Sequence, residues 1–242
     1  MKLIFIRHGD PDYVNDTITE RGKIEVEALT ERVLKWDVDE IFLSPLGRAQ
    51  DTAKPYLEKS GRHAETLPWL REFNGHAIRP HTGKQALPWD FMPDFWTNVP
   101  ELYDKDFWYK APVMQTGDVE EQAEWVYEEF DKLLAQRGYI RDGRVYKTEK
   151  GNNKTLVFFC HLGVQLLILS HLFGISAPCL WQNFFVAPTS VTVVETQERE
   201  EGRACFRCQK LGDTAHLEAA GIKPSRSGFF EEVYGEEKFD IF

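Results

Sequence analysis

Four short polar segments of the sequence each follow an apolar stretch, and their side chains suit phosphate chemistry. The segments are Arg7-His8-Gly9, Ser44-Pro45-Leu46-Gly47-Arg48, Leu70-Arg71-Glu72 and His161-Leu162-Gly163. Two guanidinium groups can hold one phosphate through bidentate, charge-assisted hydrogen bonds. The amides of a helix that starts after His161 would add donors, with the helix dipole in the favourable sense. The pattern therefore predicts a site for a phosphorylated ligand.

The same set of side chains can carry out phosphoryl transfer. An imidazole in such a pocket can attack phosphorus and form a phosphohistidine. A carboxyl group can protonate the leaving oxygen and then help a water molecule to attack. A second imidazole can stabilise the equatorial oxygens in the transition state. The set contains no metal cage, so we expect the chemistry to need neither a metal ion nor another cofactor.

Short apolar runs alternate with helical patterns along the chain, and they must position these segments. The runs predict strands over residues 2–6, 40–43, 64–67 and 154–160, and alternating residues predict late strands over 190–196 and 203–209. Apolar residues at helical spacing predict helices near 20–36, 44–60, 118–138 and 163–173. Thr19, Ser44 and Asp118 are the expected N-caps, with Glu121 completing a capping box after Asp118. This alternation is typical of an α/β protein with a mostly parallel sheet, in which ligands bind beyond the carboxyl ends of the strands.

Residues 73–117 have a different character. Three Trp, three Phe and two Tyr fall between Trp89 and Tyr109, and no helical or strand period runs through them. We expect a loop-rich aromatic insertion within a single domain that spans residues 1–242. The insertion is either a surface excursion packed on its own aromatic rings or a lid over the pocket. As a lid, Trp89 or Trp96 would hold a flat or apolar part of the ligand.

Composition limits the classes of function that fit the chain. The 242 residues include 29 Lys and Arg against 39 Asp and Glu, a net charge of −10, which disfavours binding to nucleic acid. No apolar run approaches the roughly 20 residues that span a membrane. Four cysteines do not make a disulfide scaffold, and Cys205 and Cys208 form one isolated CxxC. We therefore expect a cytoplasmic protein without a membrane or nucleic-acid partner.

The chain resembles a known family, the histidine phosphatase superfamily, which also contains the cofactor-dependent phosphoglycerate mutases. The resemblance rests on the four segments in this order and on Gly212-Asp213-Thr214-Ala215-His216-Leu217, which is similar to the usual closing segment. It covers roughly residues 1–72 and 118–217. The fold that it implies is a three-layer α/β/α sandwich of the phosphoglycerate mutase-like type.

The resemblance also implies a role for each matching residue. His8 would be the phosphorylated nucleophile, and Glu72 the general acid and later the base. Arg7 and Arg48 would hold the phosphoryl oxygens, and His161 would complete the phosphate pocket as a catalytic and binding residue. Glu65 and Glu101 are competing candidates for the acid, and Asp10 and Asp12 fit either the pocket rim or a turn.

The sequence departs from the mutase pattern in three places. Asp10 and Pro11 replace the usual Glu-Ser after the first glycine, and Val14 stands where mutases have an asparagine. Phe73-Asn74-Gly75-His76 replaces the Arg-His-Tyr-Gly that follows the acid in mutases. Leu162 replaces a glycine but keeps the backbone amide. The first two departures favour a phosphatase over a mutase.

A phosphatase that acts on a phosphomonoester is therefore the leading hypothesis. Its partner would be a small phosphorylated substrate or a phosphoprotein, and the pattern assigns no oligomeric state. Alternatives are mutase-type phosphoryl transfer and a catalytically silent binding module of the same fold. A zinc protein built on Cys205, Cys208, His76 and His81 is a remote further alternative.

Overall fold

The structure of the protein is a computed structural model that describes residues 1–229. Residues 230–242 of the predicted domain lie outside the described residues. Its main sheet has eight strands in the order β5-β4-β10-β1-β11-β12-β9-β8. The strands at its centre are the predicted apolar runs β1 (Lys2–Arg7), β4 (Glu40–Leu43) and β10 (Thr155–Cys160), which are almost wholly buried. Both of their faces are covered, so continuous apolar sequence is what these strands require.

The sheet is only half parallel, which corrects the expectation of a mostly parallel sheet. β5 (Glu65–Thr66), β4, β10 and β1 run parallel to one another. β11 (Val191–Glu200), β12 (Arg203–Asp213), β9 (Val145–Lys147) and β8 (Ile140–Asp142) add four antiparallel pairings. For β11 and β12 the cause is the short turn between them, in which Gly202 has a φ of 75°, because a tight turn can join only antiparallel strands.

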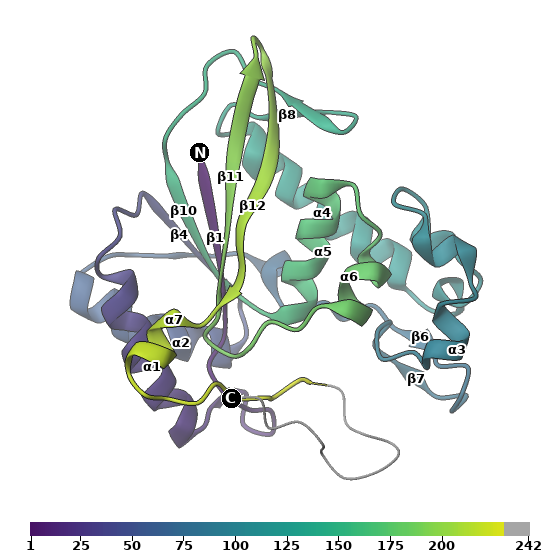
Figure 1. Cartoon of the computed structure of the whole chain (residues 1–242), viewed down its shortest axis with the longest axis horizontal. Coiled ribbons are helices and arrows are strands. Elements are labelled where there is room, and N and C mark those ends of the chain that lie inside the picture. Colours follow the sequence, from purple (N-terminus) through teal and green to yellow (C-terminus); the bar gives the residue numbers. More distant parts are fainter. Residues whose placement is uncertain (230–242) are drawn as a thin grey trace.

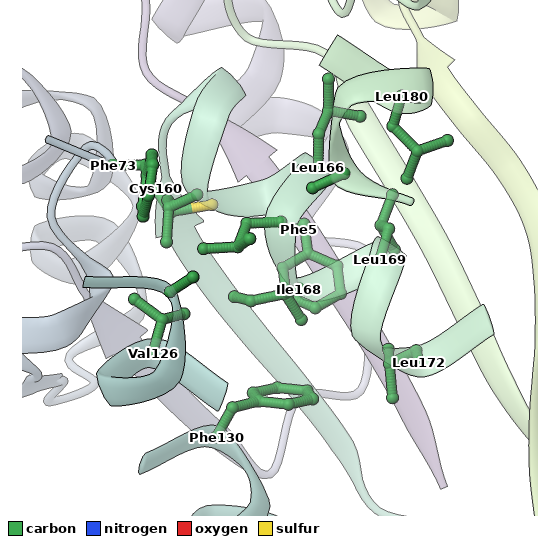
Figure 2. Close-up of a cluster of buried hydrophobic side chains, with 14 of the residues drawn as sticks. Phe5, Phe73, Val126, Phe130, Cys160, Leu166, Ile168, Leu169, Leu172 and Leu180 are labelled. Carbon is green, nitrogen blue, oxygen red and sulfur yellow. The ribbon is translucent and has the colours of Figure 1, made fainter. Parts of the chain in front are cut away.

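Helices cover both faces of the sheet (Figure 1). One layer contains α1 (Glu20–Val33), α2 (Gly47–Ser60) and α7 (Ala215–Ala219), and the other contains α4 (Val119–Ala135), α5 (Leu162–Phe173) and α6 (Ala177–Asn183). Alternate residues of β1 point into two separate cores, with Ile4 and Ile6 toward α1 and Leu3 and Phe5 toward α4 and α5. Figure 2 shows Phe5 with Phe130 and Ile168 in the second core. The expected three-layer α/β/α architecture is confirmed.

The helix starts show where local sequence signals are overridden by tertiary contacts. Thr19 caps α1 as expected, its hydroxyl accepting from the amide of Gly22. In contrast, α2 begins at Gly47 and Ser44 lies outside it. Asp118 precedes α4 but makes no capping bond within the helix, because its carboxylate accepts from the amide of His76 at 2.7 Å. The predicted capping box is therefore wrong.

The segment 73–117 consists of short elements. They are the small hairpin of β6 (Ala77–Ile78) and β7 (Gln85–Ala86), the single-turn α3 (Pro93–Trp96), and 3-10 turns at Pro100–Tyr103, Trp108–Lys110 and Met114–Thr116. Leu102, Trp108 and Met114 reach the core beside α4 and α6, so the segment is anchored rather than merely laid on the surface. In residues 1–229, no helix combines the length and apolar character needed to cross a membrane.

Candidate active site

The ends of β1 and β10 bring two histidines together. The strands are parallel neighbours with Arg7 opposite Cys160, so the residue after each strand leaves the sheet at the same edge. These residues are His8 and His161, whose ring centroids lie 5.1 Å apart. Both side chains are almost completely buried. Two imidazoles therefore lie together at the carboxyl ends of the strands, the edge at which α/β proteins bind ligands.

A hydrogen bond to the backbone fixes the state of the His8 ring. Its Nδ1 lies 2.8 Å from the carbonyl oxygen of Gly9. A carbonyl can only accept, so Nδ1 carries the proton and Nε2 keeps its lone pair. Burial, followed by the charge of Arg7, holds the pKa of His8 well below its ordinary value. The neutral imidazole is the form that can act as a nucleophile.

The His8 loop is held from two sides. The amide of Gly9 donates to the hydroxyl of Thr52 at 2.9 Å. The amide of Thr189 donates to the carbonyls of Arg7 and His8, each at 3.1 Å. Thr189 itself has a φ of 59°, an uncommon conformation for a β-branched residue and a form of local strain that is often found at functional sites. The sequence gives no signal for this position.

Ser44 orients His161. The Ser44 hydroxyl lies 2.6 Å from His161 Nε2, and the oxygen also accepts from the amide of Leu46 at 3.2 Å. Nδ1 is buried and has no hydrogen-bond partner among the described residues. When the Ser44 hydroxyl donates to Nε2, the proton of the neutral ring is on Nδ1, and Nδ1 becomes a donor. Burial and the neighbouring His8, Arg48 and Arg7 lower the pKa of His161 well below its ordinary value.

Arg7 and Arg48 bring positive charge close to the two imidazoles. Both are buried, and the Nε of each has no hydrogen-bond partner among residues 1–229. Arg7 donates to the carbonyls of Val186 at 2.6 Å and Ser227 at 2.7 Å, which fix the plane of its guanidinium. Arg48 lies in the first turn of α2, where its charge opposes the helix dipole. Buried guanidinium groups with spare donors suit an anionic ligand.

Two residues that sequence reasoning missed complete the surroundings of Arg48. Asp16 accepts from Arg48 Nη1 at 2.6 Å and from the amide of Gly47 at 2.7 Å, and its own φ is 49°. The ring of Tyr13 lies 5.5 Å from the Arg48 guanidinium carbon and meets the His8 ring edge-on, with centroids 6.5 Å apart. Both belong to the loop after Gly9, where no recognisable motif marks them.

Glu72 lies against the N-terminus of α5. Its Oε1 accepts from the amide of Phe73 at 2.8 Å and from the amide of Val164 at 3.0 Å. Burial raises the pKa of Glu72, and the amides of Gly163, Val164 and Phe73 partly counteract it. A carboxyl group with a raised pKa that is held against the start of a helix can deliver a proton. Glu65 and Glu101, the competing candidates, are both exposed.

The remaining candidates have structural contacts. Asp12 accepts from the amides of Val14 and Asn15 and so belongs to a turn. Asp10 binds the hydroxyls of Thr19 and Ser225, which ties the C-terminal segment to the loop after His8. Among residues 1–229, no three His, Cys, Asp or Glu side chains gather closely enough to hold a metal ion.

The comparison with known families decides the identity of the fold. The family model described as "Histidine phosphatase superfamily (branch 1)" matches residues 3–208. The chain belongs to the histidine phosphatase superfamily. One curated relative, a Schizosaccharomyces pombe protein named as a probable phosphatase, is 36% identical over 67 residues, which cover 24% of this chain and 32% of the relative.

Solved structures of the superfamily share the fold at low sequence identity. A phosphoserine phosphatase mutant from Entamoeba histolytica in complex with phosphoserine is 18% identical, with a TM-score of 0.57 and coverage of 89% of this chain and 98% of that one. A mycobacterial glucosyl-3-phosphoglycerate phosphatase is also 18% identical, with a TM-score of 0.58 and coverage of 87% and 98%. These likenesses establish the phosphoglycerate mutase-like fold.

Proposed function

We propose that this protein is a phosphatase that hydrolyses a phosphomonoester through a phosphohistidine on His8, without a metal ion. The single observation that carries the proposal is the hydrogen bond from His8 Nδ1 to the Gly9 carbonyl. It leaves Nε2 unprotonated beside two buried arginines. Membership of the histidine phosphatase superfamily and the phosphatase names among its relatives support the same conclusion.

In the first step, His8 Nε2 attacks phosphorus and the bond between phosphorus and the ester oxygen breaks. Glu72 gives its proton to that oxygen, which leaves as an alcohol. Arg7 and Arg48 hold the equatorial oxygens as charge builds on them, and the Nδ1 proton of His161 adds another donor. The products of this step are a phosphohistidine and an ionised Glu72.

In the second step, the ionised Glu72 removes a proton from a water molecule as its oxygen attacks phosphorus. The nitrogen–phosphorus bond then breaks, inorganic phosphate leaves, and neutral His8 and protonated Glu72 are restored. Water is the expected acceptor because Val14 stands where mutases carry an asparagine, and its apolar side chain is 93% exposed. We further propose a small phosphorylated substrate and a cytoplasmic setting, since all four cysteines are free thiols.

Hydrolysis of p-nitrophenyl phosphate in the presence of EDTA tests the proposal, with the His8→Ala variant beside the wild type. We expect phosphate release that survives EDTA and disappears in the variant. Rapid quenching with radiolabelled substrate should trap an acid-labile, base-stable phosphoenzyme only in the wild type. Activity that requires a metal ion, or that persists in His8→Ala, would exclude this mechanism. Transfer of the label to a second alcohol rather than to water would indicate a mutase.

A further inference from the structure

A small cavity with aromatic walls lies beside the predicted phosphate pocket. Its volume is about 120 Å³. Four segments far apart in the sequence build it: the loop before α3, the start of α5, the end of α6 with the residues after it, and the C-terminal segment. The lining residues that matter here are Trp89, Leu162, Trp181, Phe184, Phe185 and Phe229.

One wall of the cavity is shared with the catalytic carboxyl group. A Cβ atom added at Gly163 would lie 2.6 Å from the Trp89 ring and 2.7 Å from Glu72 Oε1. The Trp89 ring and the Glu72 carboxylate therefore approach the same point of the α5 backbone. The indole nitrogen of Trp181 donates to the Gly163 carbonyl at 3.0 Å, which fixes the Trp181 ring against the same turn of α5. The cavity thus lies on the side of the site from which the leaving oxygen would receive its proton.

A second wall is shared with the phosphate-binding arginine. The Arg7 guanidinium carbon lies 5.6 Å from the centre of the Phe185 ring. Phe185 in turn meets the ring of Phe229 edge-on, with centroids 5.1 Å apart. An ester whose phosphate is held by Arg7 would therefore have its alcohol part next to these two rings.

The C-terminal wall is anchored to the active site. The Ser227 carbonyl accepts from Arg7, the amide of Ser225 donates to the buried Glu25 at 3.2 Å, and the hydroxyl of Ser225 binds Asp10. These contacts hold the backbone that presents Phe229. The wall is thus part of the same rigid assembly as the phosphate pocket.

The lining selects for an apolar, flat group. Among residues 1–229, none of those that line the cavity is charged, and the polar side chains are those of Gln182 and Asn183. Such a surface offers no charged partner to a carboxylate, which would lose hydration on entry. The volume is close to the roughly 150 Å³ of an apolar cavity that accepts benzene. It therefore matches one six-membered ring rather than a polyanion or a fused ring system.

We propose that this cavity binds the alcohol part of the substrate, and that the natural substrate is a phosphomonoester of an alcohol carrying a single aromatic ring. The inference rests on the proposed phosphatase function and adds the substrate class to it. Trp96, which the sequence also suggested for this role, stacks on Tyr103 and lies outside the cavity lining. The aromatic contact is made instead by Trp89 together with Phe185 and Phe229.

Benzyl phosphate and ethyl phosphate provide the test because both release an alkoxide of similar basicity. We expect wild-type kcat/KM to favour benzyl phosphate by at least about 30-fold, since even one or two extra methylene groups in a fitting pocket are worth tenfold or more. Phe229→Ala should reduce this preference by about three- to tenfold, the value of one edge-on ring contact. Phe107→Ala is the matched control, because Phe107 is similarly exposed and does not line the cavity.

The two proposals fail in distinguishable ways. If the wild type hydrolyses both esters equally well through His8, or if Phe229→Ala leaves the preference intact, the phosphatase function stands and the aromatic site is wrong. If neither ester is hydrolysed, the p-nitrophenyl phosphate assay decides the phosphatase proposal, and calorimetry with benzylphosphonate and ethylphosphonate decides the aromatic site. Tighter binding of benzylphosphonate that weakens in Phe229→Ala supports the site. Equal affinities, or no binding of either, overturn it.

Discussion

Adding one methyl group at Gly163 should damage catalysis without dismantling the fold. Gly163 is the second residue of α5, and the amides around it hold the Glu72 carboxylate. The Cβ of an alanine there would lie 2.7 Å from Glu72 Oε1, whereas ordinary contacts begin at 3.4 Å. The carboxylate must therefore retreat by about 0.7 Å, and the Trp89 ring, at 2.6 Å, by about 0.8 Å.

The magnitude follows from these distances. A misplacement of about 1 Å at a reacting group can cost about 100-fold in rate. The free energy of unfolding should change less: overpacking costs about 1–3 kcal/mol, and replacing a helical glycine returns about 0.5–1 kcal/mol. We therefore expect Gly163→Ala to fold, with kcat/KM for an alkyl phosphate reduced by about 100-fold.

Two substrates separate a displaced acid from general damage. An alkoxide must be protonated as it leaves, whereas p-nitrophenolate leaves without help. Gly163→Ala should therefore lose about 100-fold in kcat/KM with ethyl phosphate and less than about tenfold with p-nitrophenyl phosphate. Gly174→Ala is the control for stability. Gly174 lies just beyond the same helix with a φ of 64°, so a side chain there strains the backbone, but the nearest atom to the added Cβ would be 3.9 Å away. Equal losses with both esters would refute the placement of Glu72 as the acid.

Three further predictions follow from the same geometry. Glu72→Gln should lower kcat/KM for ethyl phosphate by about 10²–10⁴-fold. It should also remove the loss of activity that occurs in the wild type when the pH rises and Glu72 ionises. A wild-type pH profile without this loss would contradict the raised pKa of Glu72. Ser44→Ala should reduce kcat/KM by about tenfold, the value of one net hydrogen bond near 1.4 kcal/mol, and ¹⁵N NMR should show His161 losing its Nδ1–H tautomer; an unchanged tautomer would show that Ser44 does not set it. Between pH 6.5 and 4 the wild type should lose about 3 kcal/mol of unfolding free energy that His216→Gln keeps, because burial lowers the pKa of His216 to about 4. Thermal melts across this range measure the loss, and an equal loss in the variant would assign the effect to other groups.

The sequence predicts the floor of the candidate site because its determinants are local. Each central strand is a continuous apolar run, so its end is visible, and His8 and His161 are the first residues beyond such ends. The parallel pairing of these strands then makes the two histidines neighbours. Glu72 is reached less directly, because a 3-10 turn at Pro68–Leu70 separates it from β5, and the resemblance to the family carries that assignment.

What the sequence does not predict depends on contacts between distant residues. Ser44 has the residue type and position of a helix cap, and only the tertiary structure shows that it serves His161 117 residues away. Asp16 and Thr189 adopt positive φ angles that nothing in their side chains demands. The antiparallel half of the sheet is not predicted for a similar reason, since alternation identifies β11 and β12 as strands but does not give their direction relative to β1.

Burial has opposite consequences for activity and for stability at acidic pH. It lowers the pKa of His8, His161 and His216, so His8, the proposed nucleophile, stays unprotonated as the pH falls below 6.5. The unfolded chain, however, binds protons on these same histidines below 6.5, so each of them makes the folded state less stable as the pH falls. Glu72 has the opposite sign, because its raised pKa lets the folded state keep a proton that the unfolded chain loses above about 4.5. Because the histidines oppose the fold as the pH falls, we expect the free energy of unfolding to decrease below pH 6.5 over a range in which His8 is still neutral.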